Sequence, residues 1–464
     1  MTTRSHDIFD FLKYAGNQME GKVEYWDALF DSQSSCSISK DNIDERISLP
    51  ELFGIQLRSF KDGIWRSAST YRIEKPRLKE LAEKLTKPRP KILRKVKLDE
   101  LKPSKLNVTM PVRKNPADVS LESKLEDLRN FHKASLKLDT RVINVVTRYL
   151  GSQIERIFVN SEGSSMRQEV TRTRLIMLSI ARENGKIRSD YEILGGTKGY
   201  EVVKECDFNA IAKKTVDSSI ELLSAKTPPS GEFPVIVDSS MAGLIAHESF
   251  GHGLEADQVV RQRSYLAELI DKQVASEPTT IIDSSIVPGG HGSYAFDDEG
   301  VAAKESILVK NGILKQFLTD RFSASVLGCK PTASSRVESY LTKHFVRMSN
   351  TYFAQGDMTL EELLEPVKKG VMLVRSSFGM EDPLGGGMQC SSNKGYMIEH
   401  GQVGTPLTEI SLSGSVLEVL KGIDGVGKTI EFGAGTCGKG SEDYVPVGDG
   451  GPYLRVRKAV VSGG

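Results

Sequence analysis

The residues best suited to chemistry in this 464-residue sequence are two histidines that flank a glutamate. Glu248 follows His247 directly, and His252 lies five positions after the first histidine. In hydrolytic enzymes imidazoles hold Zn²⁺, and a neighbouring carboxylate takes a proton from the water molecule that the metal activates. The stretch therefore has the residue types of a metallohydrolase site, although such a spacing also arises by chance in long chains.

The five-residue spacing predicts that the helix carrying these histidines is distorted. In the familiar H-E-x-x-H pattern the histidines lie about 40° apart around a helix, whereas five positions place them about 140° apart. A regular α-helix could not direct both imidazoles at one ion. A π-bulge or a local break near Gly251 and Gly253 would absorb the extra residue, and such bulges are frequent at functional sites.

A catalytic zinc site has a third protein ligand and an open fourth position, so another donor must come from elsewhere in the chain. The candidates are Cys437, His291, His344, Glu255 and Asp257. Cys437 ranks first because the glycines around it, in residues 433–438, let the backbone approach another element, and Zn²⁺ would keep its sulfur as a thiolate. Glu255 and Asp257 are better suited to orienting ligands or ending the helix.

The pattern of apolar residues predicts an α+β fold of two domains, each with a largely antiparallel sheet and helices. We place the domains at residues 1–226 and 227–464, because residues 227–231 are rich in proline and glycine. Helical periodicity marks residues 7–18, 76–85, 118–136, 140–150 and 208–225. The metal-site helix is expected at residues 240–252. Strands are expected at 23–39, 55–69, 154–159, 168–182, 186–193, 233–238, 281–286, 306–318, 345–353, 371–376 and 395–401. Asp62-Gly63 divides 55–69 into the two strands of a hairpin, and Asn184-Gly185 forms the turn between 168–182 and 186–193.

Composition excludes several classes of protein. Lys plus Arg (62) nearly balances Asp plus Glu (61), which argues against a dedicated nucleic-acid binder. The N-terminal stretch is polar and no run approaches 18 apolar residues, so neither a signal peptide nor a membrane span is expected. Five scattered cysteines without a C-x-x-C pair fit a reducing compartment. We expect a soluble, cytoplasmic protein with neither nucleic acid nor membrane as a partner.

Two other stretches, at residues 422–429 and 87–95, have patterns typical of phosphate binding and of binding to an acidic partner, but their sequence context does not support these functions. Residues 422–429 match the phosphate-binding pattern G-x-x-x-x-G-K-T, which works only between a strand and a following helix. Here a helix-like segment precedes the motif and no room for a helix follows, so a turn leading to the strand of Cys437 is expected. The basic, proline-spaced run at residues 87–95 is interpreted as a solvated linker.

Residues 247–257 resemble the H-E-x-x-x-H-G-L-E-x-D signature of the TldD/PmbA metalloproteases, also called modulators of DNA gyrase. Other segments match in the family's order: F-D-D-E-G at 296–300, R-M-S-N-T-Y at 347–352, G-T-C-G-K at 435–439, and P-V-G with G-P at 446–452. The resemblance is sharp from about residue 230 onward and looser over 154–195. Because this chain keeps the motif, it resembles the catalytic, TldD-like type.

The resemblance implies that His247, His252 and Cys437 bind Zn²⁺ and that Glu248 is the general base. It also implies peptides or unfolded proteins as substrates, and a homodimer or a heterodimer with a PmbA-like subunit that lacks the motif. One departure is the G-G-G-M-Q-C sequence at 385–390, which adds Cys390 as a rival thiolate. The acidic residues 297–299 remain open between a site role and a structural role.

The leading hypothesis is a zinc-dependent peptidase that hydrolyses peptides or unfolded polypeptide segments. The alternative is a non-catalytic regulatory or binding protein with a structural metal. A structural site would have four protein ligands and no need for Glu248.

Overall fold

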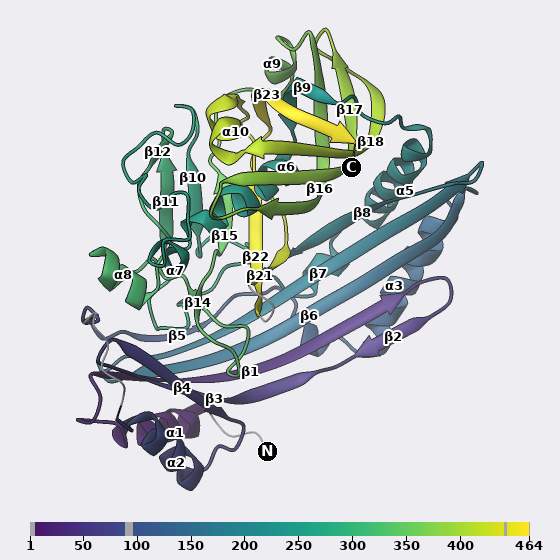
Figure 1. The fold of residues 1–464 in the computed structure, drawn as a ribbon. Coiled ribbons are helices and arrows are strands. Elements are labelled where there is room, and N and C mark those ends of the chain that lie inside the picture. The colour runs from purple at the N-terminus through teal and green to yellow at the C-terminus, as the bar shows by residue number, and fades with distance from the viewer. Residues whose placement is uncertain (1–4, 89–95, 440–442, 464) are drawn as a thin grey trace.

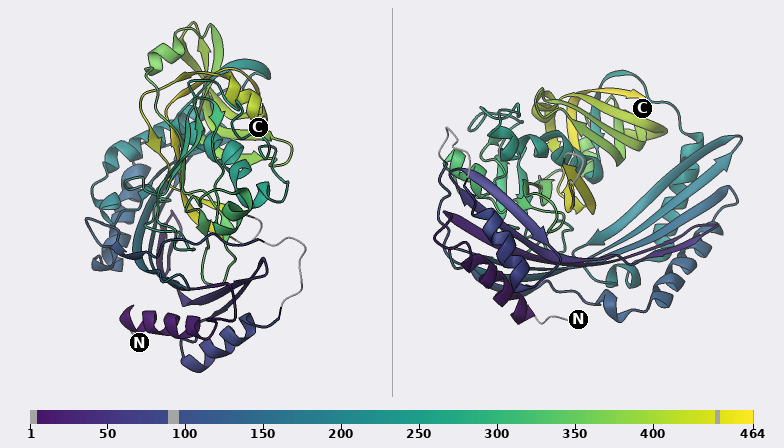
Figure 2. Two further views of the ribbon diagram at one scale, coloured as in Figure 1. Left: turned by 90° about the vertical axis from the view of Figure 1, so that its left-hand side faces the viewer. Right: turned by 60° about the horizontal axis from the view of Figure 1, so that its bottom comes forward.

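A long, curved β-sheet spans the lower part of the molecule, and the C-terminal half of the chain lies over one of its faces (Figures 1 and 2). This computed structural model describes residues 5–88, 96–439 and 443–463. Among those residues, eight strands form the long sheet, in the order β4-β3-β1-β6-β7-β5, with β2 beside β1 and β8 beside β7. Their bounds are β1 (Tyr25–Lys40), β2 (Glu45–Ser48), β3 (Glu51–Lys61), β4 (Ile64–Thr70), β5 (Lys105–Thr109), β6 (Val142–Asn160), β7 (Ser165–Glu183) and β8 (Lys186–Gly196).

Tight turns set the register of this sheet. Asp62 and Gly63 connect β3 to β4, and Asn184 and Gly185 connect β7 to β8, all four with positive φ. Such turns match the twist of paired strands, and Asn, Asp and Gly adopt positive φ most readily. The hairpins predicted at these two positions are confirmed.

The helix predicted at residues 140–150 is wrong, because this stretch begins strand β6. Val142, Val145 and Thr147 are β-branched and buried, and the strand pairs with both β1 and β7. Branched side chains lose rotamer freedom in a helix and pack well on a pleated surface. The apolar pattern of residues 140–150 fits either a helix or a strand, and pairing with a strand on each side makes this stretch part of a strand.

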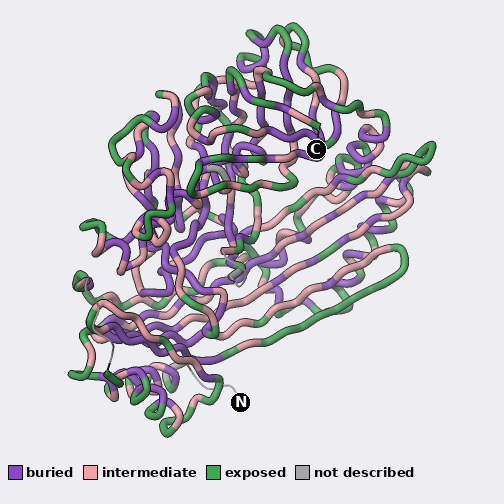
Figure 3. The backbone as a smooth tube through the Cα atoms, in the orientation of Figure 1, coloured by how far each residue is buried: buried purple, intermediate pink, exposed green. Residues whose placement is uncertain are grey.

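Helices cover the ends of the long sheet. Their bounds are α1 (Ser5–Asn17), α2 (Lys75–Leu85), the 3₁₀ helix η1 (Pro116–Asp118), α3 (Leu121–Leu136), α4 (Glu201–Lys204) and α5 (Phe208–Ser224). Buried apolar residues of α1 and α2 share a core with β1, β3 and β6. The tips of the hairpins and β2 are exposed (Figure 3). Of the basic run at 87–95, residues 89–95 lie outside the described residues.

In the C-terminal half, one sheet closes on itself. Its described strands run in the order β18-β17-β16-β9-β23-β19, and β18 also pairs with β23. The bounds are β9 (Gly231–Val237), β16 (Lys369–Glu381), β17 (Gly387–Glu399), β18 (Gln402–Ser415), β19 (Ile423–Val426) and β23 (Leu454–Gly463). The ring leaves β9, β16, β17, β18 and β23 each paired on both sides, which removes exposed edges.

A second sheet lies beside this ring. The order of its described strands is β12-β11-β10-β15-β22-β20, and β21 pairs with β22. The bounds are β10 (Ile281–Ser284), β11 (Glu305–Lys310), β12 (Ile313–Leu314), β15 (Asn350–Phe353), β20 (Glu431–Phe432), β21 (Gly435–Lys439) and β22 (Asp443–Gly451), with β13 (Ser335–Arg336) and β14 (Phe345–Val346) paired separately. Helices of this half are α6 (Ser239–Leu244), α7 (Ala256–Val259), α8 (Arg321–Leu327), α9 (Leu360–Leu364) and α10 (Val416–Gly422).

The α+β prediction with mainly antiparallel sheets is confirmed, since within the described residues only β5–β7, β9–β16 and β15–β22 are parallel pairs of strands. The single strand expected at 345–353 is divided into β14 and β15, and β18 was not predicted. We propose 1–226 and 227–464 as the two domains, because no described strand before residue 227 joins a sheet formed after it. No helix among the described residues is long and apolar enough to cross a membrane.

Buried arginines of the long sheet connect it to loops of the C-terminal half. Arg58 donates to Asp27 on its own sheet and, through Nη1, to Glu299 Oε1 at 3.1 Å. Arg156 bonds with both Asp31 and Asp298. The side chains of Arg58 and Glu299 are 6% and 1% exposed, so these charges balance each other away from water. This layer of charge pairs fixes how the two halves of the chain pack together.

We expect Arg58→Met to destabilise the protein by about 3–5 kcal/mol, because it leaves the carboxylates of Asp27 and Glu299 buried without their partner. Urea denaturation measures this change. The control is Arg77→Met, which removes an exposed pair with Glu80 and should cost less than about 1 kcal/mol. Equal effects of the two substitutions would contradict the importance of the buried layer.

Candidate metal centre

The helix that carries the two histidines is widened along half its length. It begins as α6, continues as a π-helix (η2, Ile245–Gly251) and tightens into a 3₁₀ turn (η3, His252–Leu254). A π-helix accommodates the residue in excess of the regular repeat, so the predicted distortion is confirmed. As a result, the imidazole rings of His247 and His252 lie with their centroids 5.2 Å apart.

Close packing holds this helix in place. The carboxylate of Asp238 caps its first turn by accepting from Met241 N, at 2.8 Å. A Cβ atom at Gly243 would lie 2.6 Å from the backbone nitrogen of Gly450, and one at Gly251 would lie 2.0 Å from Met348 Sδ. The glycines thus let the helix approach β22 and the segment before β15 more closely than any other residue would allow.

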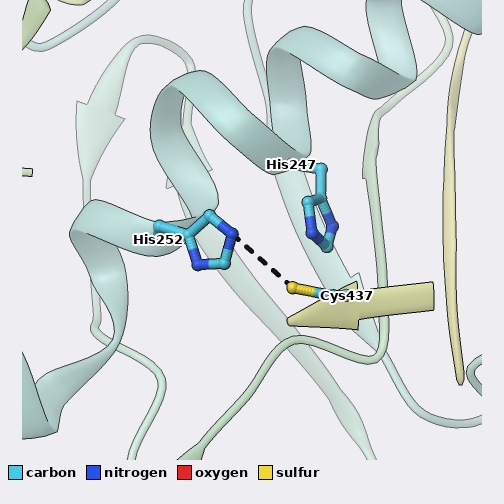
Figure 4. Close-up of side chains that lie close together, drawn as sticks. All are labelled: His247, His252 and Cys437. Carbon is cyan, nitrogen blue, oxygen red and sulfur yellow. Dashed lines mark hydrogen bonds between the residues drawn. The ribbon is translucent and has the colours of Figure 1, made fainter. Parts of the chain in front are cut away.

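Cys437 reaches the two histidines from strand β21, on the other side of the site (Figure 4). One ligand atom from each of His247, His252 and Cys437 lies within 4.8 Å of the others. Cys437 Sγ is 3.6 Å from His252 Nε2. The structure therefore brings together the three residues that sequence analysis ranked as ligands.

This donor set fits a metal ion. Tetrahedral Zn²⁺ with ordinary Zn–N and Zn–S bonds requires ligand atoms about 3.3–3.6 Å apart, close to the separation of the Cys437 and His252 donors. His247 Nδ1 is buried and has no hydrogen-bond partner among the described residues. Burial would raise the pKa of the Cys437 thiol, but the two imidazoles beside it lower that pKa to about 4, so the sulfur is a thiolate at neutral pH.

A buried carboxylate orients the second histidine. Glu255 Oε2 lies 3.2 Å from His252 Nδ1, which leaves Nε2 directed at Cys437. Lys439 Nζ lies 3.0 Å from the same Glu255 oxygen and 2.6 Å from Asp257 Oδ1. Burial would raise the pKa of Glu255, but Lys439 and His252 lower it to about 2, so the group remains an anion. Such carboxylates fix the tautomer and orientation of ligating histidines.

Glu248 lies beside the cluster of His247, His252 and Cys437 but is not one of its members. Its Oε2 lies 3.8 Å from His252 Nε2, and its side chain is 27% exposed. Burial raises the pKa of Glu248 above the ordinary value of a glutamate, although the two histidines act in the opposite direction. The carboxylate is therefore adjacent to the metal position and is a stronger base than a glutamate in water.

Sequence analysis missed a second carboxyl group near the site, that of Glu381 on β16. Both of its oxygens are buried and have no hydrogen-bond partner among the described residues. Burial, only partly offset by His252, raises the pKa of Glu381 to about 9, so this carboxyl is protonated at neutral pH. The only signal in the sequence was its place in the segment before residues 385–390, where the chain departs from the family pattern.

None of the other sequence candidates belongs to the cluster of three donors found among the described residues. His344 bonds with Gln56, and His291 lies in a loop against the long sheet. Cys390 is fully buried in the apolar core of the C-terminal half. The acidic residues at 297–299 bond with arginines and backbone amides, as the pairs of Asp298 and Glu299 illustrate.

The phosphate-loop motif also has no matching structure. Residues 422–429 begin at the last residue of helix α10 and include strand β19, and the next described element is strand β20. No helix follows the motif in this described stretch, so the amides that cradle phosphates are missing there.

Comparison with known proteins agrees with this geometry. Models of the PmbA/TldA metallopeptidase central and C-terminal domains match residues 114–223 and 230–463. A metalloprotease of Methanothermobacter thermautotrophicus is 34% identical over 98% of this chain and 99% of its own length. A zinc metalloprotease TldD homolog of Saccharolobus solfataricus is 32% identical, over 73% of this chain and 76% of its own.

The fold is also found among solved structures. A Thermotoga maritima protein described as a modulator of DNA gyrase has a TM-score of 0.81 at 23% identity, covering 99% of this chain and 100% of that one. Family models and full-length relatives match the chain, and histidine and thiolate donors meet at one point in its structure. The chain therefore belongs to the PmbA/TldA family, the TldD/PmbA family that its sequence resembles, and is a metallopeptidase with a metal cofactor.

Proposed function

We propose that this chain is a zinc peptidase in which Glu248 acts as the general base on peptides or unfolded polypeptide segments. The observation that carries the proposal is the meeting of His247, His252 and Cys437, with the Glu248 carboxylate 3.8 Å from His252. Two imidazoles and a thiolate suit zinc better than the hard cations, which prefer oxygen donors. The relative from Saccharolobus solfataricus is also named as a zinc metalloprotease.

Zinc held by these three ligands would acidify a water molecule and polarise the scissile carbonyl. The Glu248 carboxylate would take the proton from that water and then deliver it to the leaving amine. Burial raises the pKa of Glu248, and this supports the role because a raised pKa makes the carboxylate a stronger base. Glu255 would keep His252 in the tautomer that presents Nε2 to the metal.

The alternative of a structural metal receives less support. A structural zinc site is usually closed by four protein ligands, whereas the cluster of described residues contains three. A closed site would also have no use for a carboxylate placed like that of Glu248. We therefore favour an open, catalytic site.

We further propose that the substrate binds as an extended strand. Strand β21, which carries Cys437, pairs with β22 along one edge, and among the described residues no strand pairs with its other edge. Main-chain hydrogen bonds to such an edge require an extended chain but little sequence. Phe378, Met380 and Leu384, each more than half exposed near Glu381, offer apolar contacts for such a chain or for a second subunit.

We also propose a homodimer or a heterodimer with a PmbA-like subunit, and a cytoplasmic location. The exposed apolar side chains around residue 380 support the first proposal, since contiguous apolar surface marks interaction sites. No disulfide links any of the five cysteines, all of which the structure describes, and this supports a reducing compartment.

The proposed roles of Cys437 as a metal ligand and Glu248 as the general base predict different effects of substitution on zinc affinity and on kcat. Cys437→Ala should lower zinc affinity by more than about 100-fold, since loss of even an outer partner typically costs about 10–100-fold. Glu248→Gln should retain zinc and lower kcat by about 100–10,000-fold. Elemental analysis and hydrolysis of an unfolded polypeptide measure both. Cys390→Ala is the control and should keep zinc; cleavage by Glu248→Gln at the wild-type rate would move the structural-metal alternative ahead.

A glycine on β16 tests the position of Glu248 without touching a ligand. A Cβ atom at Gly379 would lie 2.5 Å from Glu248 Cγ, so Gly379→Ala should displace the carboxylate. We expect unchanged zinc content and a loss of about 100-fold in kcat, the usual effect of a displacement of about 1 Å. The control is Gly387→Ala, whose Cβ meets no atom within 4 Å. Full activity of Gly379→Ala would show that Glu248 is not the base.

A further inference from the structure

We propose that a cavity between the long sheet and the C-terminal half binds a small oxyanion, held by Arg172 and Arg174. The cavity has a volume of about 240 Å³ and is separate from the metal centre. An anion site in this cavity is a feature beyond the proposed peptidase activity, because none of the groups that would bind the anion belongs to the metal site. Its lining also includes serine and threonine hydroxyls, together with apolar residues such as Leu150 and Pro446.

The register of the sheet places the binding groups side by side. Ser35 of β1 lies opposite Ser152 of β6, which in turn lies opposite Arg172 of β7. In the adjacent row Ser37 lies opposite Leu150, and Leu150 opposite Arg174. Residues two apart on a strand project from the same face, so both arginines and these serines face the C-terminal half together.

The other side of the cavity is formed by a loop and a hairpin of the C-terminal half. His291 comes from the loop between β10 and β11, and Thr436 from strand β21. Arg172 Nε donates to the carbonyl of His291 at 2.7 Å, and its Nη2 donates to the carbonyl of Ser293 at 2.8 Å. These carbonyls fix the guanidinium in position but do not neutralise its charge.

The charge of this cavity is not balanced by protein groups. Among the described residues neither Arg172 nor Arg174 forms an ion pair, and no Asp or Glu lines the cavity. In the same interface Arg58 and Arg156 each bond with two carboxylates. Asp298, the acidic group that acts on Arg172, is already bonded to Arg156 and to the amide of Val337. A buried cation normally requires a partner, so an anion from solution completes the site.

Titration of the neighbouring groups agrees with a positive potential. Burial, together with the charges of Arg336 and Arg156, lowers the pKa of Arg172 to about 9. Burial and the charges of Arg172 and Arg174 lower the pKa of His291 well below its usual value. Each of these groups is therefore harder to protonate here than in water, as expected where a negative charge would be stabilised.

The size and donors of the cavity define the ligand. It is smaller than the cavities of about 300–1,000 Å³ that hold organic ligands, and its donors are guanidinium and hydroxyl groups. A planar guanidinium matches two oxygens of a phosphate, sulfate or carboxylate. The ligand is thus a free tetrahedral anion or the terminal carboxylate of a peptide, two sources with the same chemistry.

Binding of inorganic phosphate to the zinc-loaded full chain, at constant ionic strength, tests the proposal. Among the described residues, the one hydrogen bond of the Arg174 side chain is a weak 3.5 Å contact with Ala434 O, so we expect Arg174→Gln to fold normally. The substitution should weaken phosphate binding by about tenfold or more, the usual effect of losing a charged hydrogen bond. Arg182→Gln, an exposed arginine on the same strand, is the matched control and should bind as wild type. Arg172→Gln is a second test, and Glu248→Gln should still bind phosphate because no catalysis is needed.

The same titration with acetyl-dialanine and its C-terminal amide separates the two sources. Arg174-dependent binding of phosphate or sulfate alone assigns the site to a free anion, and Arg174-dependent binding of the acid but not the amide assigns it to a chain terminus. Equal affinities of Arg174→Gln and Arg182→Gln for every probe, or no binding of any probe to the wild type, would overturn the proposal.

Discussion

The metal centre depends on one residue in excess of the helical repeat. With His247 and His252 five positions apart, the two imidazoles can share an ion only if the helix widens, and the π-helical stretch Ile245–Gly251 provides that widening. The widened helix packs closely against its neighbours. Gly251 allows this packing because a Cβ atom at this position would collide with Met348. The spacing of the histidines thus requires the π-helix, and the π-helix in turn requires a glycine where it contacts Met348.

Charges are used differently in the two parts of the protein. At the metal centre, Lys439 contacts Glu255, and Glu255 contacts His252, so a chain of charged groups ends at one of the three candidate ligands. Between the two halves of the chain, pairs such as Arg58 with Glu299 balance each other and serve packing. Buried pairs add little net stability but are costly to break, and they therefore favour one arrangement of the halves over others.

Most of the features that could be predicted from the sequence depend on local backbone geometry or on the chemistry of single residue types. The turns at Asp62 and Asn184 and the distortion of the metal helix follow from backbone preferences and helical geometry, which are local. The metal donors could be ranked because ligand chemistry limits the choice to a few residue types. The strand at Val142 could not be recognised, since its state depends on neighbours that lie far away in sequence. Glu381 was missed for the same reason, because its pKa is set by a burial that no motif records.

The order in which the chain is made has a consequence for the metal site. Cys437 is synthesised 190 residues after His247 (437 − 247), a delay of roughly 10–40 s at a rate of about 5–20 residues per second. Strand β23, which completes the ring around β9, emerges later still. A nascent chain therefore has two histidines and Glu248 but lacks the thiolate of Cys437, so the three donors of the metal centre cannot meet until most of the protein has been translated. Under the proposed activity on unfolded polypeptides, this order of synthesis would keep the nascent chain from cleaving itself.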